Sequence, residues 1–371
     1  MNLHIGVLSG DGIGPEVTNQ SIKILTAIAD KYQHTFTFQH ELVGAIAIDE
    51  TGNPLPQKTL GLCLDADAVL FGAIGDPKYD NNPDAKVRPE QGLLALRKAL
   101  GLFANIRPVK AYDTLLDKSP LKKHIIQDTD IVIYRELTGG IYFGEKTLSE
   151  DGTAASDLCS YSKAEIERVA HFAFKAAQGR RKKLTLVDKA NVLETSRLWR
   201  KVVTAMASQY PDVELDFLFV DNAAMQMLLN PSQFDVILTE NMFGDIISDE
   251  ASVIGGSIGL LASASVGEKY ALFEPIHGSY PQATGKGIAN PVASILSAAM
   301  LLDHFGLSEE AETVRDAVER AIDLEICTPD LNAHGGYSTE NVGTFIEEFI
   351  ENVDALHINS GNIKVGQSTI I

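Results

Sequence analysis

Three aspartates have the residue type and spacing of metal ligands. Asp245 and Asp249 lie four residues apart in "ENMFGDIISDEAS", a stretch with helical spacing, so their carboxylates share one face. Asp221 ends the strand-like run "ELDFLFVD", and α/β proteins place functional side chains at strand ends. Carboxylates with no histidine or cysteine nearby favour Mg²⁺ or Mn²⁺ over Zn²⁺. The alternative is a helix cap at Asp221 and a solvated acidic helix face.

Three arginines have the chemistry to bind a dicarboxylate. Arg107 in "ANIRPVK" and Arg135 in "VIYRELTGG" each lie near the end of a β-like run. The third belongs to one helical stripe with positions i, i+3, i+4 and i+7: Glu90, Leu93, Leu94 and Arg97. Guanidinium groups from three elements could converge on two carboxylates through paired hydrogen bonds. The alternative is three separate surface salt bridges.

Two further residues could move protons. Lys189 lies in the apolar, strand-like context "LTLVDKANVL", and a lysine in low-dielectric surroundings can act as base, acid or Schiff-base former. Tyr142 follows the glycine pair in "TGGIYFGE", where the backbone can approach a ligand. The alternatives are a solvent-facing lysine and a packed tyrosine. A Schiff-base lyase using Lys189, or a binding protein without catalysis, therefore remains a rival function.

The glycines of "GVLSGDGIGPEV" raise the question of a dinucleotide loop. They lie between a strand-like run and a helix that begins near Pro15. Their spacing is G-x-G-x-G rather than G-x-G-x-x-G, and no acidic residue closes a following strand about 20 residues later. A tight strand-to-helix turn in which only glycine fits is the alternative interpretation.

The elements that must position these residues alternate between strand and helix. The β-like runs "DAVLFGAIG", "FANIRPVKAY" and "DIVIYREL" are separated by helical stretches such as "EQGLLALRKALGL", which predicts an α/β fold with largely parallel sheets. The glycine-rich segment "TGGIYFGEKTLSEDGTAASDLCSYS" predicts a hairpin arm outside the main sheet. The tail "HINSGNIKVGQSTII" predicts an extended appendage.

Bulk properties restrict the partners and the compartment. The 371 residues predict two domains. A net charge of −19 argues against nucleic acid and anionic membrane as partners. We expect no leader segment before the first strand-like run and no bilayer-spanning segment, because the longest apolar stretch is too short and too rich in glycine and serine. Three widely spaced cysteines, Cys63, Cys159 and Cys327, suit a reducing cytoplasm.

Together these motifs identify a resemblance. In chain order, "GDGIGPEV", "GAIGDPK", "GLLALRKALGLFANIRPVK", "YRELTGGIYFGE", "VDKANVLETSRLW", "NMFGDIISDEAS", "EPIHGSYPQATGKGIANP" and "GGYSTENVG" resemble the β-decarboxylating dehydrogenases almost end to end. The resemblance implies a two-domain isopropylmalate/isocitrate dehydrogenase-like α/β fold with parallel and mixed sheets flanked by helices, not a Rossmann fold. Residues 1–102 with 256–371 would form the cofactor-side domain, and 103–255 the second domain with the arm and dimer interface.

The resemblance also implies the reaction. We expect NAD-dependent oxidative decarboxylation of 3-isopropylmalate, a step of leucine biosynthesis, in a cytoplasmic homodimer with active sites between the domains. Lys189 and Asp221 would come from the other subunit. Lys189 would take the hydroxyl proton, directly or through water, and Tyr142 would protonate the enol carbon or relay that proton. The metal would bind Asp221, Asp245 and Asp249. Relatives acting on tartrate, D-malate, isocitrate or homoisocitrate remain the alternative.

The resemblance assigns the remaining roles by position. The three arginines would hold the carboxylates, Leu93 and Leu94 would face the isopropyl group, and Glu90 would lie near the nicotinamide and repel a third carboxylate. The expected cofactor contacts are Ile13, Gly75, Asp76, Glu90, His277, Gly278, Ser279, Tyr280, Pro281, Gln282, Ala283, Thr284, Gly285, Lys286, Gly287, Ile288, Ala289 and Asn290. NAD-using members usually carry Asp where this chain has Gln282, and a small residue where it has Tyr280. The cofactor loop thus departs from the family pattern at two positions.

Overall fold

The computed structural model describes residues 1–82, 85–332 and 335–356. These form two compact units, the first comprising Met1–Leu96, Ser257–Ala264 and the described residues from Tyr270 onward, and the second Arg97–Gly256 and Ser265–Lys269. The domains expected from the sequence have different bounds and remain a proposal. The expected C-terminal appendage, 357–371, lies outside the described residues.

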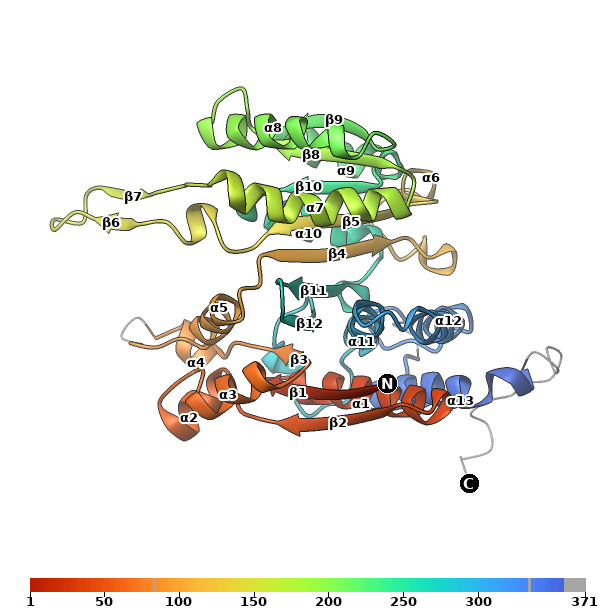
Figure 1. Cartoon of the computed structure of the whole chain (residues 1–371). Helices are drawn as coiled ribbons and strands as arrows, with labels where there is room; N and C mark the ends of the chain where they lie inside the picture. The colour runs from red at the N-terminus through yellow and green to blue at the C-terminus, as the bar shows by residue number, and fades with distance from the viewer. Residues whose placement is uncertain (83–84, 333–334, 357–371) are drawn as a thin grey trace. The chain divides into compact units, whose positions relative to one another are not determined.

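The first unit is built on a sheet covered by helices (Figure 1). Its strands follow the order β2-β1-β3-β12-β11, with bounds β1 (Asn2–Gly10), β2 (Thr35–His40), β3 (Ala68–Ala73), β11 (Ala262–Val266) and β12 (Ala271–Pro275). Strand β1 is parallel to β2 and β3, and β12 is parallel to β3. The helices are α1 (Gly14–Tyr32), α2 (Ala45–Thr51), α3 (Gln57–Asp65), α4 (Pro77–Asp80), α5 (Pro89–Ala99), α11 (Val292–His304), α12 (Ser308–Asp323) and α13 (Thr339–Leu356).

The second unit is a mixed sheet with helices on both faces. Its strands follow the order β4-β5-β10-β8-β9, with bounds β4 (Ala104–Lys110), β5 (Asp130–Glu136), β8 (Lys183–Asp188), β9 (Glu214–Phe219) and β10 (Val236–Thr239). Within this five-stranded order, β4 and β5 pair antiparallel and the other neighbouring strands pair parallel. The helices are α6 (Lys123–Ile126), α7 (Lys163–Gly179), α8 (Glu194–Met206), α9 (Val220–Leu229) and α10 (Asn241–Ala251). Helices α7 and α8 cover one face, and α9 and α10 the other (Figure 1).

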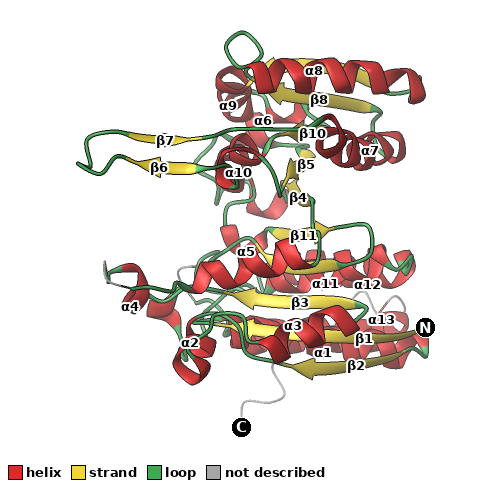
Figure 2. Ribbon diagram, turned by 60° about the vertical axis from the view of Figure 1, so that its left-hand side comes forward, coloured by secondary structure: helices red, strands yellow, loops and turns green. Residues whose placement is uncertain are grey.

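The expected glycine-rich hairpin leaves the second unit as an arm. Strands β6 (Lys146–Leu148) and β7 (Ala155–Asp157) pair antiparallel, and Figure 2 shows them projecting away from the unit's main sheet. All six of their residues are exposed. Among the described residues, no helix combines the length and apolar character that a membrane crossing requires.

Burial explains why these residues form these elements. Strands β3 and β10 are buried throughout, as expected of parallel strands covered on both faces. Helix α1 begins with proline in its first turn and buries one apolar face, and α7 begins with a capping box formed by Ser162 and Glu165. The predicted α/β class with parallel and mixed sheets flanked by helices is confirmed.

Candidate active site

Two buried arginines lie next to each other in the second unit. Asn105 of β4 pairs with Arg135 of β5 in the antiparallel register, and Arg107 lies two residues further along β4, so all three side chains share one face. Arg107 and Arg135 are only 8% and 5% exposed. Burial, and then the charge of Arg107, lower the pKa of Arg135 to about 10. The two strands therefore bring concentrated positive charge to one place.

The two aspartates of α10 lie against these arginines. Arg135 Nη1 forms an ion pair with Asp245 Oδ1. Arg107 Nη1 lies 3.3 Å from Asp249 Oδ1, and its Nη2 lies 3.8 Å from Asp245 Oδ1. The acidic helix face is therefore not simply solvated, because two guanidinium groups offset the repulsion between the carboxylates.

Two polar residues of the same helix face complete the cluster. Asn241 Oδ1 accepts hydrogen bonds from Arg135 Nε at 3.1 Å and Nη2 at 2.8 Å. Ser248 Oγ lies 2.6 Å from Arg107 Nη1. Sequence reasoning missed both residues, although their spacing of i and i+7, with the aspartates at i+4 and i+8, marks one face of a helix.

Tyr142 joins the same cluster. It ends the 3₁₀ helix Gly140–Tyr142, and its hydroxyl donates a 2.9 Å hydrogen bond to Asp245 Oδ2. Its ring centroid lies 5.8 Å from Arg135 Cζ. Burial and then the Asp245 carboxylate raise the pKa of Tyr142. The hydroxyl therefore keeps its proton at neutral pH.

Lys189 and Asp221 form a separate pair. Lys189 Nζ lies 2.6 Å from Asp221 Oδ1, and this contact lowers the pKa of Asp221. The expectation that Lys189 is buried within a strand is wrong: β8 ends at Asp188, and the lysine side chain is 25% exposed. Asp221 likewise follows β9 and lies in the first turn of α9.

The three expected metal ligands do not meet within one chain. In the described part of the chain, no group of three histidine, cysteine, aspartate or glutamate residues is arranged to hold a metal ion. Asp245 and Asp249 alone lie together, with side chains 34% and 65% exposed. Their accessible carboxylate oxygens fit a hard divalent cation that completes its coordination with other oxygens.

The comparisons with known proteins identify the family. The model described as isocitrate/isopropylmalate dehydrogenase matches residues 4–353. The chain belongs to this family. Relatives named 3-isopropylmalate dehydrogenase from Bacteroides fragilis (strain YCH46) and Geobacillus kaustophilus (strain HTA426) are 52% and 55% identical to it, covering 94% and 90% of this chain and 99% and 91% of theirs. The crystal structure of isocitrate dehydrogenase from Methylococcus capsulatus matches with a TM-score of 0.85 and 34% identity, over 94% of this chain and 99% of that chain.

The expected substrate helix of the family is α5. Its Glu90 and Leu94 are exposed and Leu93 is half-buried. A Cβ atom at Gly75 would lie 3.0 Å from Glu90 Oε1, so two expected cofactor contacts lie close together. The boundary between the two units falls within α5, so Arg97, near the end of this helix, belongs to the second unit. Its positive charge contributes to the lowered pKa of Arg135. The charges of two of the expected arginines thus act on the third.

The second expected cofactor loop, 277–290, has a buried histidine at its start and is held by hydrogen bonds at its end. Burial lowers the pKa of His277, so its imidazole is neutral at pH 7, and its buried Nε2 has no hydrogen-bond partner among the described residues. Asn290 Nδ2 donates a 3.1 Å bond to Asp330 Oδ2, and Thr328 Oγ1 lies 2.5 Å from Asp330 Oδ1. Sequence reasoning missed Asp330, which lies 40 residues beyond Asn290.

The two residues that depart from the family pattern are both exposed. Tyr280 is 54% exposed and adopts a left-handed backbone conformation, with φ of 39° and ψ of 64°. This conformation is costly for a non-glycine residue. Gln282 lies in the following 3₁₀ helix, Pro281–Ala283. Both side chains are therefore accessible to a ligand.

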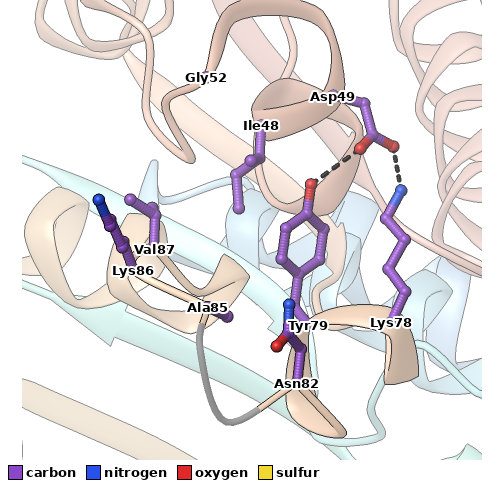
Figure 3. Close-up of a pocket in the computed structure, with 9 residues that line it drawn as sticks. All are labelled: Ile48, Asp49, Gly52, Lys78, Tyr79, Asn82, Ala85, Lys86 and Val87. Atoms are coloured by element: carbon purple, nitrogen blue, oxygen red, sulfur yellow. Dashed lines mark hydrogen bonds and ion pairs between the residues drawn. The ribbon is translucent and has the colours of Figure 1, made fainter.

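A pocket of about 470 Å³ lies beside α2 and α4 of the first unit (Figure 3). Asp49 pairs with Lys78 and accepts a 2.8 Å hydrogen bond from the Tyr79 hydroxyl. The pocket is lined by Ile48, Asp49, Gly52, Lys78, Tyr79, Asn82, Ala85, Lys86 and Val87. None of the expected site residues lines it.

Three further carboxyl groups lie at the ends of three neighbouring strands of the second unit. Glu136 ends β5, Asp188 ends β8 and Glu240 follows β10. Arg200 forms two 2.8 Å bonds to Asp188, and Arg168 lies 3.4 Å from Glu136. Glu240 is 4% exposed, and its Oε2 has no hydrogen-bond partner among the described residues. Burial, Asp188 and Glu136 raise the pKa of Glu240 to about 7.

Glu240→Gln is expected to stabilise the protein at pH 8 but hardly at pH 4. The folded pKa of Glu240, about 7, exceeds its ordinary value of 4.5, so wild-type stability falls as the pH rises between these values. Above pH 7, the charged Glu240 lowers the free energy of unfolding of the wild type by up to about 3 kcal/mol. The neutral amide of the variant carries no charge and does not cause this loss. Denaturant unfolding across pH 4–8 measures the difference. A gain that does not change with pH would contradict the assignment.

Proposed function

We propose that this protein catalyses the oxidative decarboxylation of 3-isopropylmalate to 4-methyl-2-oxopentanoate and carbon dioxide, with NAD and Mg²⁺ or Mn²⁺. The observation that carries the proposal is the cluster of Arg107, Arg135, Asp245, Asp249 and Tyr142. Two adjacent buried guanidinium groups suit the carboxylates of a malate-like substrate. The similar proteins named 3-isopropylmalate dehydrogenase support the choice of substrate.

Each residue has a stated role in the proposed mechanism. Arg97, Arg107 and Arg135 bind the substrate carboxylates, and substrate binding competes with the ion pair between Arg135 and Asp245. Lys189 accepts the proton of the substrate hydroxyl, and Tyr142 returns a proton to the enol carbon. Asp245 and Asp249, with Asp221 of the partner subunit, would hold the cation, which would supply charge stabilisation beside the reacting oxygens. NAD, held by the two expected cofactor loops, would supply the hydride acceptor.

We further propose a homodimer that shares its active sites. Large apolar side chains are exposed on the arm and on α9 and α10: Leu148, Leu158, Met225, Leu229 and Ile246. Asp221 pairs with Lys189 rather than joining the two aspartates of α10. Both observations support an arrangement in which one subunit supplies this pair to its partner. A cytoplasmic location, without nucleic-acid or membrane partners, belongs to the same proposal and agrees with the net charge of −19.

The direct test is an assay of NAD reduction at 340 nm with 3-isopropylmalate and Mg²⁺ or Mn²⁺, with NADP in parallel. The proposal expects the highest kcat/KM for 3-isopropylmalate with NAD. A higher kcat/KM for isocitrate, homoisocitrate, tartrate or D-malate would instead assign to this protein the activity of the relative that acts on that acid. Borohydride trapping of substrate without NAD would support a Schiff-base lyase, and no turnover of any acid would support a binding protein.

Glu90→Ser combined with Leu93→Ala is expected to shift the preference toward isocitrate or malate. The first change removes an anion that repels a third carboxylate, and the second weakens contact with the isopropyl group by about 1–3 kcal/mol. The ratio of kcat/KM values for the two acids should change by at least about tenfold. Lys98→Ala, an exposed change on α5, is the control. Unchanged ratios would mean that this helix does not contact the substrate tail.

A further inference from the structure

The glycine loop between β1 and α1 is hydrogen-bonded to the end of β3 and to the loop that contains Ser279. The backbone N–H of Asp11 donates to the carbonyl of Ala73, and that of Ile13 to the carbonyl of Ser279, both at 2.8 Å. A Cβ atom at Gly10 would lie 1.9 Å from the Ala73 oxygen, and one at Gly12 would lie 2.0 Å from the Ser279 oxygen. These glycines are therefore required for close backbone crossings.

These hydrogen bonds distinguish the glycine loop from a phosphate-binding loop. A dinucleotide loop points its free backbone N–H groups at the phosphates. Here the N–H groups of Asp11 and Ile13 are used by protein carbonyls, and Gly14 N donates to Asp11 O at 2.9 Å. The backbone of the glycine loop therefore binds neighbouring protein segments, at Ala73 and Ser279, rather than a phosphate.

Asp11 holds the first neighbour with its side chain. The carboxylate is 6% exposed. Its Oδ2 accepts hydrogen bonds from Ala45 N at 2.8 Å and Gly75 N at 2.9 Å, and its Oδ1 accepts one from Ile46 N at 3.0 Å. Asp11 thus joins the start of α2 to the segment that follows β3, where the expected cofactor contacts Gly75 and Asp76 lie.

Glu16 holds the second neighbour in the same way. Its Oε1 accepts a 2.5 Å hydrogen bond from Gly285 N, and its Oε2 a 3.2 Å bond from Gly287 N. Beneath this contact, the apolar side chains of the glycine loop, α1 and the second loop form one buried cluster: Ile13, Val17, Ala283 and Ala289. One carboxylate and one apolar cluster therefore fix the position of loop 283–289.

We propose that Asp11 and Glu16 are positioning residues of the cofactor site, each holding one of the two loops that bind the dinucleotide. The inference rests on the proposed function, which places NAD at these loops. Neither carboxylate is assigned to a reacting atom. Both act through backbone N–H groups, so their removal should affect cofactor affinity more than the chemical step.

The test compares Glu16→Gln and Asp11→Asn with wild type in the full-length protein. Asp30→Asn, at the other end of α1 and exposed, is the matched control. Each test variant weakens charge-assisted hydrogen bonds, so we expect the Kd of NADH, measured by fluorescence titration, to rise about tenfold. The value of kcat at saturating NAD should stay within about threefold. The control should match wild type in both.

Amide hydrogen exchange without cofactor supplies a second readout. Glu16→Gln should speed exchange at Gly285 and Gly287, and Asp11→Asn at Ala45, Ile46 and Gly75, each without affecting the other loop. Unchanged exchange, or faster exchange with unchanged NADH affinity, would overturn the positioning role. A uniform fall in Tm and kcat would indicate a general structural role instead. Wild type that binds no NADH would refute the cofactor assignment of the proposed function and, with it, this inference.

Discussion

Asp245→Asn is expected to lower kcat by on the order of 10³-fold or more, even at saturating Mg²⁺ or Mn²⁺. In the proposed mechanism Asp245 is a ligand of the cation, whose charge stabilisation is worth several kcal/mol, and each 1.4 kcal/mol corresponds to a factor of ten. The same carboxylate also accepts the hydrogen bond of Tyr142. Steady-state kinetics measure the fall in kcat, and calorimetric titration with Mn²⁺ measures the loss of cation affinity.

The structure also predicts how this variant affects stability. Asp245 is the ion-pair partner of Arg135, which is 5% exposed. Replacing the carboxylate with an amide leaves the guanidinium with its bonds to Asn241 but removes a charged partner. The free energy of unfolding should fall by about 1–3 kcal/mol. Asp249→Asn should lose activity with a smaller loss of stability, because its side chain is 65% exposed.

Glu250→Gln is the matched control, because it removes a carboxylate from α10 outside the arginine cluster. Its kcat and Mn²⁺ affinity should stay close to those of wild type. Near-normal turnover of Asp245→Asn would be incompatible with the metal role. Equal losses in Glu250→Gln would indicate that both changes disturb α10 as a whole.

Short-range sequence patterns predicted the acidic face of α10 but not the groups that neutralise it. The spacing of Asp245 and Asp249 defines a helix face regardless of tertiary structure. The contact with Arg107 and Arg135 depends on the antiparallel register of β4 with β5, which no local pattern specifies. The resemblance to a family placed the arginines and the aspartates in one expected site, but it did not predict the ion pairs between them.

The buried acid at Glu240 illustrates what sequence reasoning could not reach. Its surroundings follow from the strand order β5-β10-β8, which places the ends of three strands side by side. Glu136, Asp188 and Glu240 are each separated by about 50 residues in the sequence. Each alone resembles an ordinary polar residue after a buried strand.

Lys189 shows a boundary error with a physical cause. The run from Leu184 to Val187 is apolar and buried, which favours extending the strand through the lysine. At the strand end, the Asp188 carboxylate accepts hydrogen bonds from Arg200 Nε and, at 3.0 Å, from the backbone N–H of Ala190. The second bond closes a local turn that ends the strand. Lys189 therefore begins the connection to α8, where its side chain can reach Asp221.

Lys189→Met should lower kcat by about 10²–10⁴-fold, the usual contribution of a positioned general base. Methionine keeps most of the side-chain volume but cannot accept a proton. Substrate affinity should fall much less than kcat. Lys201→Met, which changes an exposed lysine on α8, should leave both values unchanged. The kcat and KM of each variant, together with the Kd of 3-isopropylmalate, separate the two effects.

The pair with Asp221 makes this prediction specific. Because Lys189 Nζ lies 2.6 Å from Asp221 Oδ1, the effects of Lys189→Met and Asp221→Asn should not add in the double variant. If Lys189 is the base, wild-type kcat rises with pH as the base loses its proton. The remaining activity of Lys189→Met should lack this rise. Unfolding of the variant, or equal losses of binding and turnover, would assign Lys189 to packing rather than to proton transfer.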